Sequence, residues 1–467
     1  MKDTKRIFIM FSFYDRTGIV KFLEKQAGEG WLLEKISAFG WKFRRIEPKS
    51  IHFSVNFFPE ASAFDPGPSE KQETFREFCE HTGWRLAARS AQIQIFYNES
   101  SDPVPIDTDP NVELENIHRS VKKTLLPTYL MQLILAVWQI VMMIIRLIDD
   151  PIMFFSMDFN LFAGISWLFA LLFYSIDLAV YYSWRARAKR EAQTNGGFLE
   201  TRGTRSFQIV AVLFMLIALA MMLLAFDSPW MTAVVFGTIA GILAITAVVL
   251  GISALLKRAK ATAKTNRAVT LILTIVLSLA FTGVLMYGVV NAVLSDMDSE
   301  IPYDTYEFRG HTYNIYRHEL PLTVEDLMFT DYDSYSYQTV EEQNSMFLEI
   351  YSARQRPKWN DLEEPELVYT MVDVKAGFLF DLCLESMLHR YDGWYSEDIY
   401  GNEYQDSYLK IDPAPWGADV AYQLCQSGTS EYSSNYLLCY GNRIVELNPD
   451  WDMTREQMGI VGELLGE

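Results

Sequence analysis

Residues 125–148 read LLPTYLMQLILAVWQIVMMIIRLI, which as a helix is long enough to cross the ~30 Å hydrocarbon core of a bilayer. Four more apolar stretches of roughly 20 to 26 residues start near Leu161, Phe207, Met231 and Ala268. Because lipid offers a bare backbone no hydrogen-bond partners, such stretches can span only as helices. The sequence therefore predicts a membrane protein with a five-helix transmembrane bundle between a head and a tail.

Positive charges lie on one side of the predicted spans. Loops rich in Lys and Arg resist translocation and stay in the cytoplasm. Cations gather before the first span, in the second-to-third loop and in the fourth-to-fifth loop: His118, Arg119, Lys122, Lys123, Arg185, Arg187, Lys189, Arg190, Arg202, Arg205, Lys257, Arg258, Lys260, Lys264 and Arg267. The alternate connections are acidic, with Asp149, Asp150, Asp158, Asp227, Asp296, Asp298 and Glu300. Five crossings then predict a cytoplasmic N-terminus and an extracytoplasmic C-terminus in the cell membrane.

The formal net charge of −19 is unevenly distributed along the chain. Nearly all of the acidic excess lies from about Leu294 onward, and the rest is slightly basic. An acidic surface outside a cell keeps a domain soluble, and cation binding is the alternative interpretation. The basic residues sit at membrane ends, where orientation and contact with anionic lipid account for them, so we expect no nucleic-acid partner.

Residues 1–100 predict an α+β domain. Strand and helix signals alternate as strand 6–13, helix 18–27, strands 31–45 and 50–58, helix 71–81 and strand 86–97. The order βαββαβ is typical of ferredoxin-like domains, in which two helices cover one face of a single antiparallel sheet. Gly30-Trp31 and Gly83-Trp84 each follow a helix and open a strand, which indicates an internal duplication.

Three segments carry a family resemblance: AGEGWLLEKISAFGWKFRRIEPKSIHFSVNFFPE at 27–60, FREFCEHTGWRLAARSAQIQIFYNE at 75–99 and DPVPIDTDPNVELENIHRSVKK at 102–123. In type and spacing they resemble the bacterial family known as domain of unknown function 2812, over about the first 120 residues. The resemblance implies a head joined to several membrane spans. Genes of the family often neighbour PadR-type transcriptional regulators, which implies a role in an envelope or stress response, but the family brings no activity and no catalytic residues.

Polar residues at apolar depth are the main site candidates. Burying an ionisable group in lipid costs at least ~2.5 kcal/mol, so Asp177 needs a partner or a function. Gln132 lies at similar depth in the first span, and we expect a hydrogen bond between the two; a shallow position reached by water and a proton or substrate pathway are the alternatives. Gln139 lies deeper and is expected to face a neighbouring helix. Arg146 is expected to snorkel to the headgroups or to pair with Asp149 or Asp150.

Gly237 and Gly241 form a small-xxx-small pair in the fourth span, which lets another helix approach closely. Packing within the bundle is favoured over homodimerisation, because four other spans are at hand.

The tail, residues 295–467, is long enough to form a domain with its own core. Its predicted secondary structure is α+β. The sequence indicates a hairpin at 306–316, a short helix at 323–328, a helix at 375–388, a hairpin at 436–447 and a last helix at 454–465. Cys383, Cys425 and Cys439 fall in this part, where oxidation is allowed. Cys425 and Cys439 are the predicted disulfide, with free buried thiols as the alternative.

The sequence holds no spacing typical of a catalytic triad, a phosphate loop or a zinc site, so we expect no enzyme, no cofactor and no bound metal. The predicted organisation is a cytoplasmic domain at 1–100, a linker at 101–124, the bundle at 125–294 and an extracytoplasmic domain at 295–467. The predicted function is regulatory or signal-coupling, between an external domain that binds a ligand or another membrane or envelope protein and the cytoplasmic domain. A transporter, or an accessory subunit of one, is the alternative, motivated by Asp177 and the glycine pair.

Overall fold

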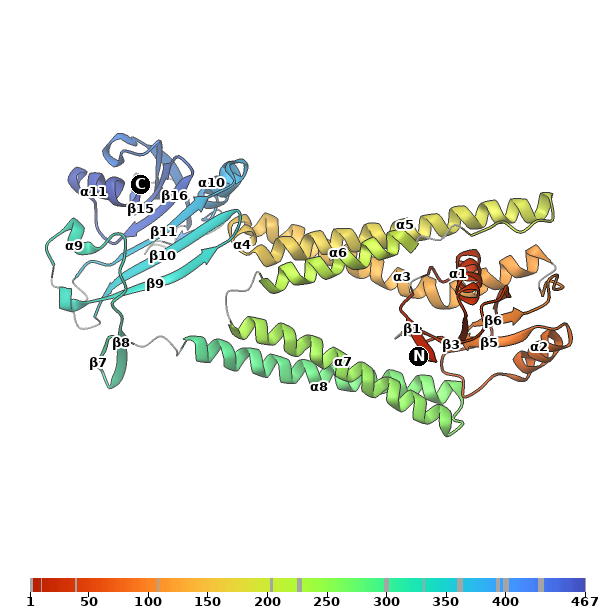
Figure 1. The fold of residues 1–467 in the computed structure, drawn as a ribbon. Coiled ribbons are helices and arrows are strands. Elements are labelled where there is room, and N and C mark those ends of the chain that lie inside the picture. Colours follow the sequence, from red (N-terminus) through yellow and green to blue (C-terminus); the bar gives the residue numbers. More distant parts are fainter. Residues whose placement is uncertain are drawn as a thin grey trace. The chain divides into compact units, whose positions relative to one another are not determined.

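The computed structural model describes residues 3–9, 11–37, 40–106, 109–201, 205–224, 229–297, 302–330, 332–358, 364–391, 395–397, 403–426 and 432–466. The chain divides into two compact units, whose elements are labelled in Figure 1. The first unit comprises Met1–Ile140 and Ile165–Ala292, and the second comprises Val141–Gly164 and Val293–Glu467. The domain boundaries expected from the sequence stay a prediction.

The N-terminal region consists of two successive βαββ repeats. The first contains β1 (Thr4–Ile7), α1 (Arg16–Gly28), β2 (Trp31–Lys35) and β3 (Trp41–Arg45). The second contains β4 (His52–Phe57), α2 (Glu70–His81), β5 (Arg85–Ser90) and β6 (Ile93–Asn98). Each repeat forms its own antiparallel sheet, in the orders β1-β3-β2 and β4-β6-β5. Strands β2 and β5 lie next to each other, so the two sheets meet at these edges.

This arrangement corrects the predicted single sheet of ferredoxin-like order βαββαβ. The segments 31–45 and 86–97, each taken as one strand, are hairpins. The second turn includes Ala91 at φ 46° and has no glycine or proline, so it left no turn signal. The duplication itself is confirmed, because Gly30 and Gly83 end equivalent helices with φ of 83° and 86°. A side chain at Gly30 would also meet the Ile46 carbonyl oxygen at 2.9 Å.

Four helices are long and apolar enough to cross a membrane within the described part of the chain: α3 (Pro110–Asp149), α5 (Asp158–Thr194), α7 (Pro229–Arg258) and α8 (Ala263–Met297). The third predicted span forms α6 (Arg205–Leu224), whose apolar part within the described residues, Ser206–Met221, is shorter than a span. The fifth crossing therefore stays a prediction. Four charged residues used for orientation lie outside the described residues: Arg202, Asp227, Asp298 and Glu300.

The C-terminal domain is built on one antiparallel sheet of order β13-β14-β15-β16-β11-β10-β9, with a short β12 beside β13. Its strands are β9 (Tyr335–Asn344), β10 (Leu348–Pro357), β11 (Leu367–Val374), β12 (Tyr395–Glu397), β13 (Glu403–Ile411), β14 (Val420–Gln426), β15 (Tyr432–Tyr440) and β16 (Arg443–Pro449). A separate hairpin, β7 (Asp304–Phe308) and β8 (His311–Ile315), precedes it, and the helices are α9 (Val324–Leu327), α10 (Phe380–Leu388) and α11 (Arg455–Leu465).

Both faces of this sheet are buried. Adjacent residues point to opposite faces of a strand, so Leu437 and Leu438 lie in two different cores. One core contains residues of α9 and α11, and the other contains residues of α10 and of α4 (Pro151–Phe155), the short helix between α3 and α5. The predicted hairpins at 306–316 and 436–447 and the helix at 454–465 are confirmed.

Candidate functional site

The N-terminal domain shares one hydrophobic core with the ends of helices α3 and α5. Tyr14, Ile19 and Val55 of the domain belong to the same buried cluster as Ile117 of α3 and Trp184 of α5. The Tyr14 and Trp184 rings stack with their centroids 5.5 Å apart. These helix ends are therefore part of the folded domain and do not merely tether it.

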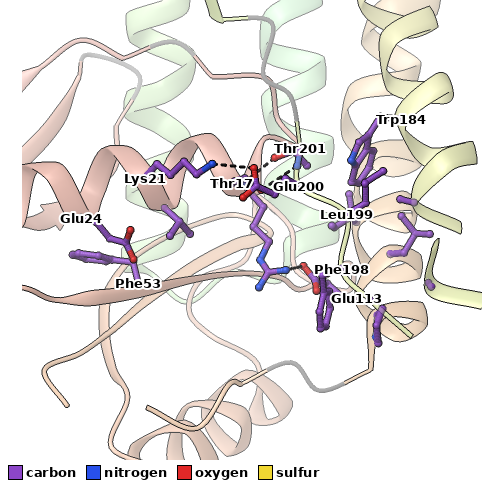
Figure 2. A pocket seen from close by; sticks show the side chains of 18 residues that line it. Thr17, Lys21, Glu24, Phe53, Glu113, Trp184, Phe198, Leu199, Glu200 and Thr201 are labelled. Carbon is purple, nitrogen blue, oxygen red and sulfur yellow. Dashed lines mark hydrogen bonds and ion pairs between the residues drawn. The ribbon is translucent and has the colours of Figure 1, made fainter. Parts of the chain in front are cut away.

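A pocket of about 310 Å³ opens at this junction, as Figure 2 shows. It lies between α1, the start of α3, the end of α5 and segment 197–201, which leads from α5 towards α6. Its lining combines apolar side chains with charged and hydroxyl groups, among them Arg16, Thr17, Lys21, Glu24, Phe53, Glu113, Trp184, Phe198, Glu200 and Thr201. Within the described part of the chain, no group of three or more His, Cys, Asp or Glu residues could hold a metal ion.

Segment 197–201 is fastened to the N-terminus of α1 by reciprocal hydrogen bonds. The Thr17 amide donates to Thr201 Oγ1 at 2.9 Å, and the Thr201 amide donates to Thr17 Oγ1 at 3.0 Å. The Thr201 hydroxyl in turn donates to Asp15 Oδ1 at 2.8 Å. The ion pair of Lys21 with Glu200, 2.9 Å long, is largely exposed and so adds little stability. Buried hydrogen bonds thus hold this segment.

The charged groups at the pocket are paired, or burial disfavours their charged form. Arg16 forms an ion pair with the buried Glu113 and lies 5.4 Å from the centre of the Phe198 ring, a cation–π contact. Burial raises the pKa of the Glu24 carboxyl. Burial lowers the pKa of His118, and the positive charge of Arg185 adds to this shift. The junction therefore disfavours charges without partners.

Further hydrogen bonds connect the domain to other helices of the same unit. The Gln208 amide group of α6 donates to Ser12 Oγ at 2.9 Å, and the Asn266 amide group of α8 donates to the Phe64 carbonyl at 3.1 Å. Lys123 of α3 donates to the carbonyl oxygens of residues 59, 60 and 61 at 3.0 to 3.3 Å. The domain is thus bonded to α6 and α8 as well as to α3 and α5.

Asp177, the main polar residue predicted from the sequence, is 1% exposed. It accepts a hydrogen bond from the Tyr129 hydroxyl at 2.7 Å, whereas Gln132 is half-buried and donates none to it. The predicted partner is therefore wrong, although the predicted helix is right. Tyr129 and Gln132 are three residues apart on one side of α3, and the longer tyrosine side chain reaches the carboxylate.

The other polar candidates lie apart from this contact. Gln139 is half-buried on α3. Arg146 is exposed and forms no ion pair with Asp149 or Asp150, both of which are described. Asp150 instead caps α4, because its carboxylate accepts a hydrogen bond from the Met153 amide at 2.8 Å.

The two glycines of the predicted small-xxx-small pair on α7 differ in their surroundings. A Cβ atom at Gly241 would lie 2.2 Å from the Phe281 ring of α8, whereas one at Gly237 would meet nothing within 4 Å. Gly241 therefore packs within the first unit, against α8.

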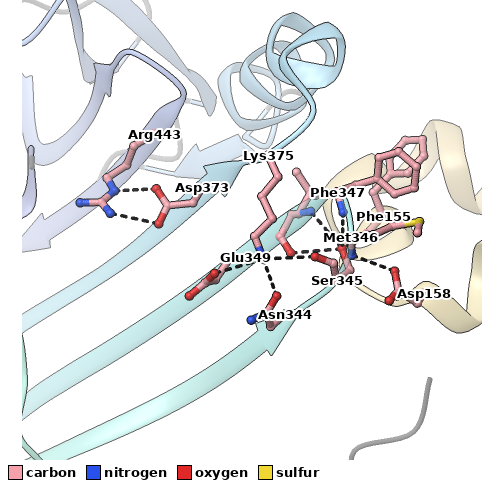
Figure 3. A network of polar contacts seen from close by, with 11 residues as sticks. Phe155, Asp158, Asn344, Ser345, Met346, Phe347, Glu349, Asp373, Lys375 and Arg443 are labelled. Carbon is pink, nitrogen blue, oxygen red and sulfur yellow. Dashed lines mark hydrogen bonds and ion pairs between the residues drawn. The ribbon is translucent and has the colours of Figure 1, made fainter. Parts of the chain in front are cut away.

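In the second unit, α4 is docked into the C-terminal domain, as Figure 3 shows in part. Ile152 is buried in the core that contains α10, and the Phe155 ring packs 5.8 Å from that of Phe347. The Ser345 hydroxyl donates to the Phe155 carbonyl at 2.7 Å, and Asp158, the first residue of α5, accepts from the Met346 amide at 2.9 Å. The turn between β9 and β10 is thereby bonded to the last residue of α4 and to the first residue of α5.

The predicted disulfide between Cys425 and Cys439 is wrong. Both are buried thiols that form no disulfide, and so are Cys79 and Cys383. They do lie on neighbouring strands, but the register pairs Cys425 with Tyr432 and Cys439 with Val420. The sequence could indicate neighbouring strands but not this register.

Sequence reasoning missed three buried acids: Asp15 and Glu113 at the junction, and Glu446 of β16, which is 3% exposed. Its carboxylate pairs with Arg390 and accepts hydrogen bonds from the Tyr391 and Tyr408 hydroxyls at 3.3 and 3.2 Å. Glu446 is the only acid in the apolar strand sequence Ile444-Val445-Glu446-Leu447, and this could have indicated a buried carboxylate.

Fold and junction together define a protein with an α+β N-terminal region, long apolar helices and a C-terminal domain on an antiparallel sheet. Residues 16–129 match the family described as protein of unknown function (DUF2812), which confirms the resemblance noted in the sequence. The match begins at Arg16 and ends at Tyr129. It therefore includes Arg16 and Glu113, which form an ion pair at the junction with α3. No curated protein matches the chain.

Proposed function

We propose that this protein couples the state of an extracytoplasmic C-terminal domain to a cytoplasmic N-terminal domain, as a regulatory membrane protein. The external domain would meet a ligand or an envelope partner, and α3 and α5 would pass on its response. The long apolar helices are suited to a lipid bilayer, because a helix satisfies its own backbone hydrogen bonds.

The continuity of α5 is the observation that carries the proposal. Its first residue, Asp158, binds the β9–β10 turn of the C-terminal domain, and Trp184, further along the same helix, lies in the N-terminal core. Helix α3 is its counterpart, running from Glu113 beside Arg16 to Asp149 beside α4. Rigid elements packed at both ends are the kind of structure that can transmit a rearrangement.

The orientation rests on charge. Cations cluster beside the helix ends that pack on the N-terminal domain, which favours a cytoplasmic position for it. With α6 as the fifth span, the acidic C-terminal domain lies on the opposite side.

Transport is less favoured than coupling. It was motivated by Asp177, and this carboxylate is buried and bonded to Tyr129 beside the N-terminal domain. Such a bond between α5 and α3 supports a structural role that keeps the two helices together.

Hydrogen exchange of the full chain in lipid nanodiscs tests the coupling. Ile152→Ala removes apolar contacts of α4 with the C-terminal core, and Leu409→Ala, at a half-exposed position on β13, is the control. Coupling predicts faster exchange of the Thr17 and Thr201 amides in the first variant and unchanged exchange in the second. If Ile152→Ala loosens residues 345–348 but leaves both amides at the wild-type rate, the proposal fails.

A further inference from the structure

The C-terminal domain exposes apolar side chains around its α4 contact. Phe378 is 78% exposed, Met346 57% and Leu382 40%, and Met153 of α4 itself is 40% exposed. Single exposed apolar residues are common on soluble domains, but a cluster of them marks an interaction surface. We call Met346, Phe378 and Leu382 the apolar rim.

The residues of the apolar rim lie around the loop between α3 and α5. The Phe347 ring, next to Met346, lies 5.8 Å from Phe155 of α4 and 6.4 Å from Phe378. Leu382, on α10, lines a pocket together with Asp149 and Pro151. Three separate segments, the β9–β10 turn (Figure 3), the 3-10 turn Gly377–Leu379 and α10, thus converge on the loop between α3 and α5.

The position of the loop between α3 and α5 indicates what the apolar rim binds. Helix α3 ends at Asp149, α4 begins at Pro151 and α5 begins at Asp158, and α3 and α5 are both candidate membrane spans. A loop of this length joining two spans lies at the membrane surface, so side chains packed around it lie at that surface too. Apolar side chains there gain stability by entering the boundary between headgroups and acyl chains.

We propose that the apolar rim binds the surface of the bilayer, with Met346, Phe378 and Leu382 inserted at the level of the upper acyl chains. The C-terminal domain is then held by lipid as well as by α4. This inference depends on α3 and α5 spanning the membrane and is independent of signal coupling. Bilayer is favoured over a second copy because the rim surrounds chain segments that enter the lipid directly.

Spin labels at single cysteines test the proposal in the full chain, in nanodiscs of phosphatidylcholine. Met346→Cys and Leu382→Cys probe the rim; Val340→Cys and Leu464→Cys, in the same domain, are controls with nearly equal exposure, 56% and 41%. Wild type measures background labelling, since its four thiols are buried. Collision rates with oxygen, which concentrates in lipid, and with a water-soluble nickel chelate report the surroundings of each label.

The proposal predicts a several-fold higher ratio of oxygen to nickel collisions at both rim positions than at both controls. Equal ratios at all four positions, with nickel collisions dominant, overturn it. Dipolar broadening at the rim that disappears on dilution with unlabelled protein also overturns it, because a second copy then covers this surface. Either result leaves the hydrogen-exchange test of coupling unaffected.

Discussion

Asp15 illustrates how single residues hold the N-terminal junction together. Its Oδ1 accepts a hydrogen bond from the Gly18 amide at 3.0 Å, which caps α1, and another from the Thr201 hydroxyl at 2.8 Å. The carboxylate is 2% exposed, so both bonds are shielded from water. One side chain thus fixes the start of α1 and the segment that follows α5.

The thiols give a residue-scale prediction. Burial raises the pKa of Cys383 and of Cys439 from 9.0 to about 11, and nearby acids, Asp150 and Asp419, add to the shifts. Below pH 11 these thiols stay protonated, so at mildly alkaline pH their reactive thiolate fraction is about 100-fold below that of an exposed thiol. We expect slow alkylation by iodoacetamide in the native protein, rising as the pH approaches 11.

Mass spectrometry after alkylation in guanidinium chloride without reductant supplies the matching control. All four cysteines should be modified, because none of them forms a disulfide. A protein with only two modified cysteines, Cys425 and Cys439 remaining blocked, would contradict the strand register.

Residue types at the junction were easier to predict than their partners. Asp177 stands out in any apolar span, but its partner depends on helix rotation and side-chain reach. Asp15 and Thr201 are separated by 186 positions in the chain, and no local pattern connects them. The apolar neighbours of Glu446 are a local signal, but they do not indicate its partners, which come from the residues after α10 and from another strand.

At the scale of elements, local signals determined what could be predicted. Helix α11 was predictable because Thr454 and Gln457 form a capping box at its start. The β7–β8 hairpin was predictable because Arg309-Gly310 makes its turn with positive φ angles. Strands β10 and β11 were missed because apolar and polar residues do not alternate simply along them. The prediction of a single N-terminal sheet was wrong because the hairpins at 31–45 and 86–97 were each taken as one strand.

The α7–α8 contact gives an element-scale prediction with a built-in control. Gly241→Ala places a methyl group against the Phe281 ring, and such overpacking should lower stability by about 1–3 kcal/mol. Gly237→Ala meets open space and should be neutral or slightly stabilising, since alanine favours helix. Thermal unfolding in detergent compares the two. If Gly237→Ala is the more damaging change, the assigned face of α7 is incorrect.

The combination of Gly241→Ala with Phe281→Ala separates this contact from other effects. Removing the ring should make room for the methyl group, so the double variant should lose less stability than the two single losses added together. Strict additivity would show that Phe281 is not the residue that the methyl group meets.

At the scale of the whole molecule, charge and hydropathy divide the chain. The acidic excess follows the last apolar helix, whereas cations flank the helix ends that pack on the N-terminal domain. The apolar stretches could be predicted from the sequence because length and composition alone identify them. The number of crossings depends on α6, whose described part ends at Leu224.

The separation of the two domains by the membrane is the central claim, and cysteine accessibility tests it most directly. Phe78→Cys in the N-terminal domain and Val340→Cys in the C-terminal domain are almost equally exposed, at 55% and 56%. In right-side-out membrane vesicles, a membrane-impermeant maleimide should label Val340→Cys at once and Phe78→Cys only after permeabilisation. Labelling of both variants before permeabilisation, or of neither, would place the two domains on one side and contradict the account.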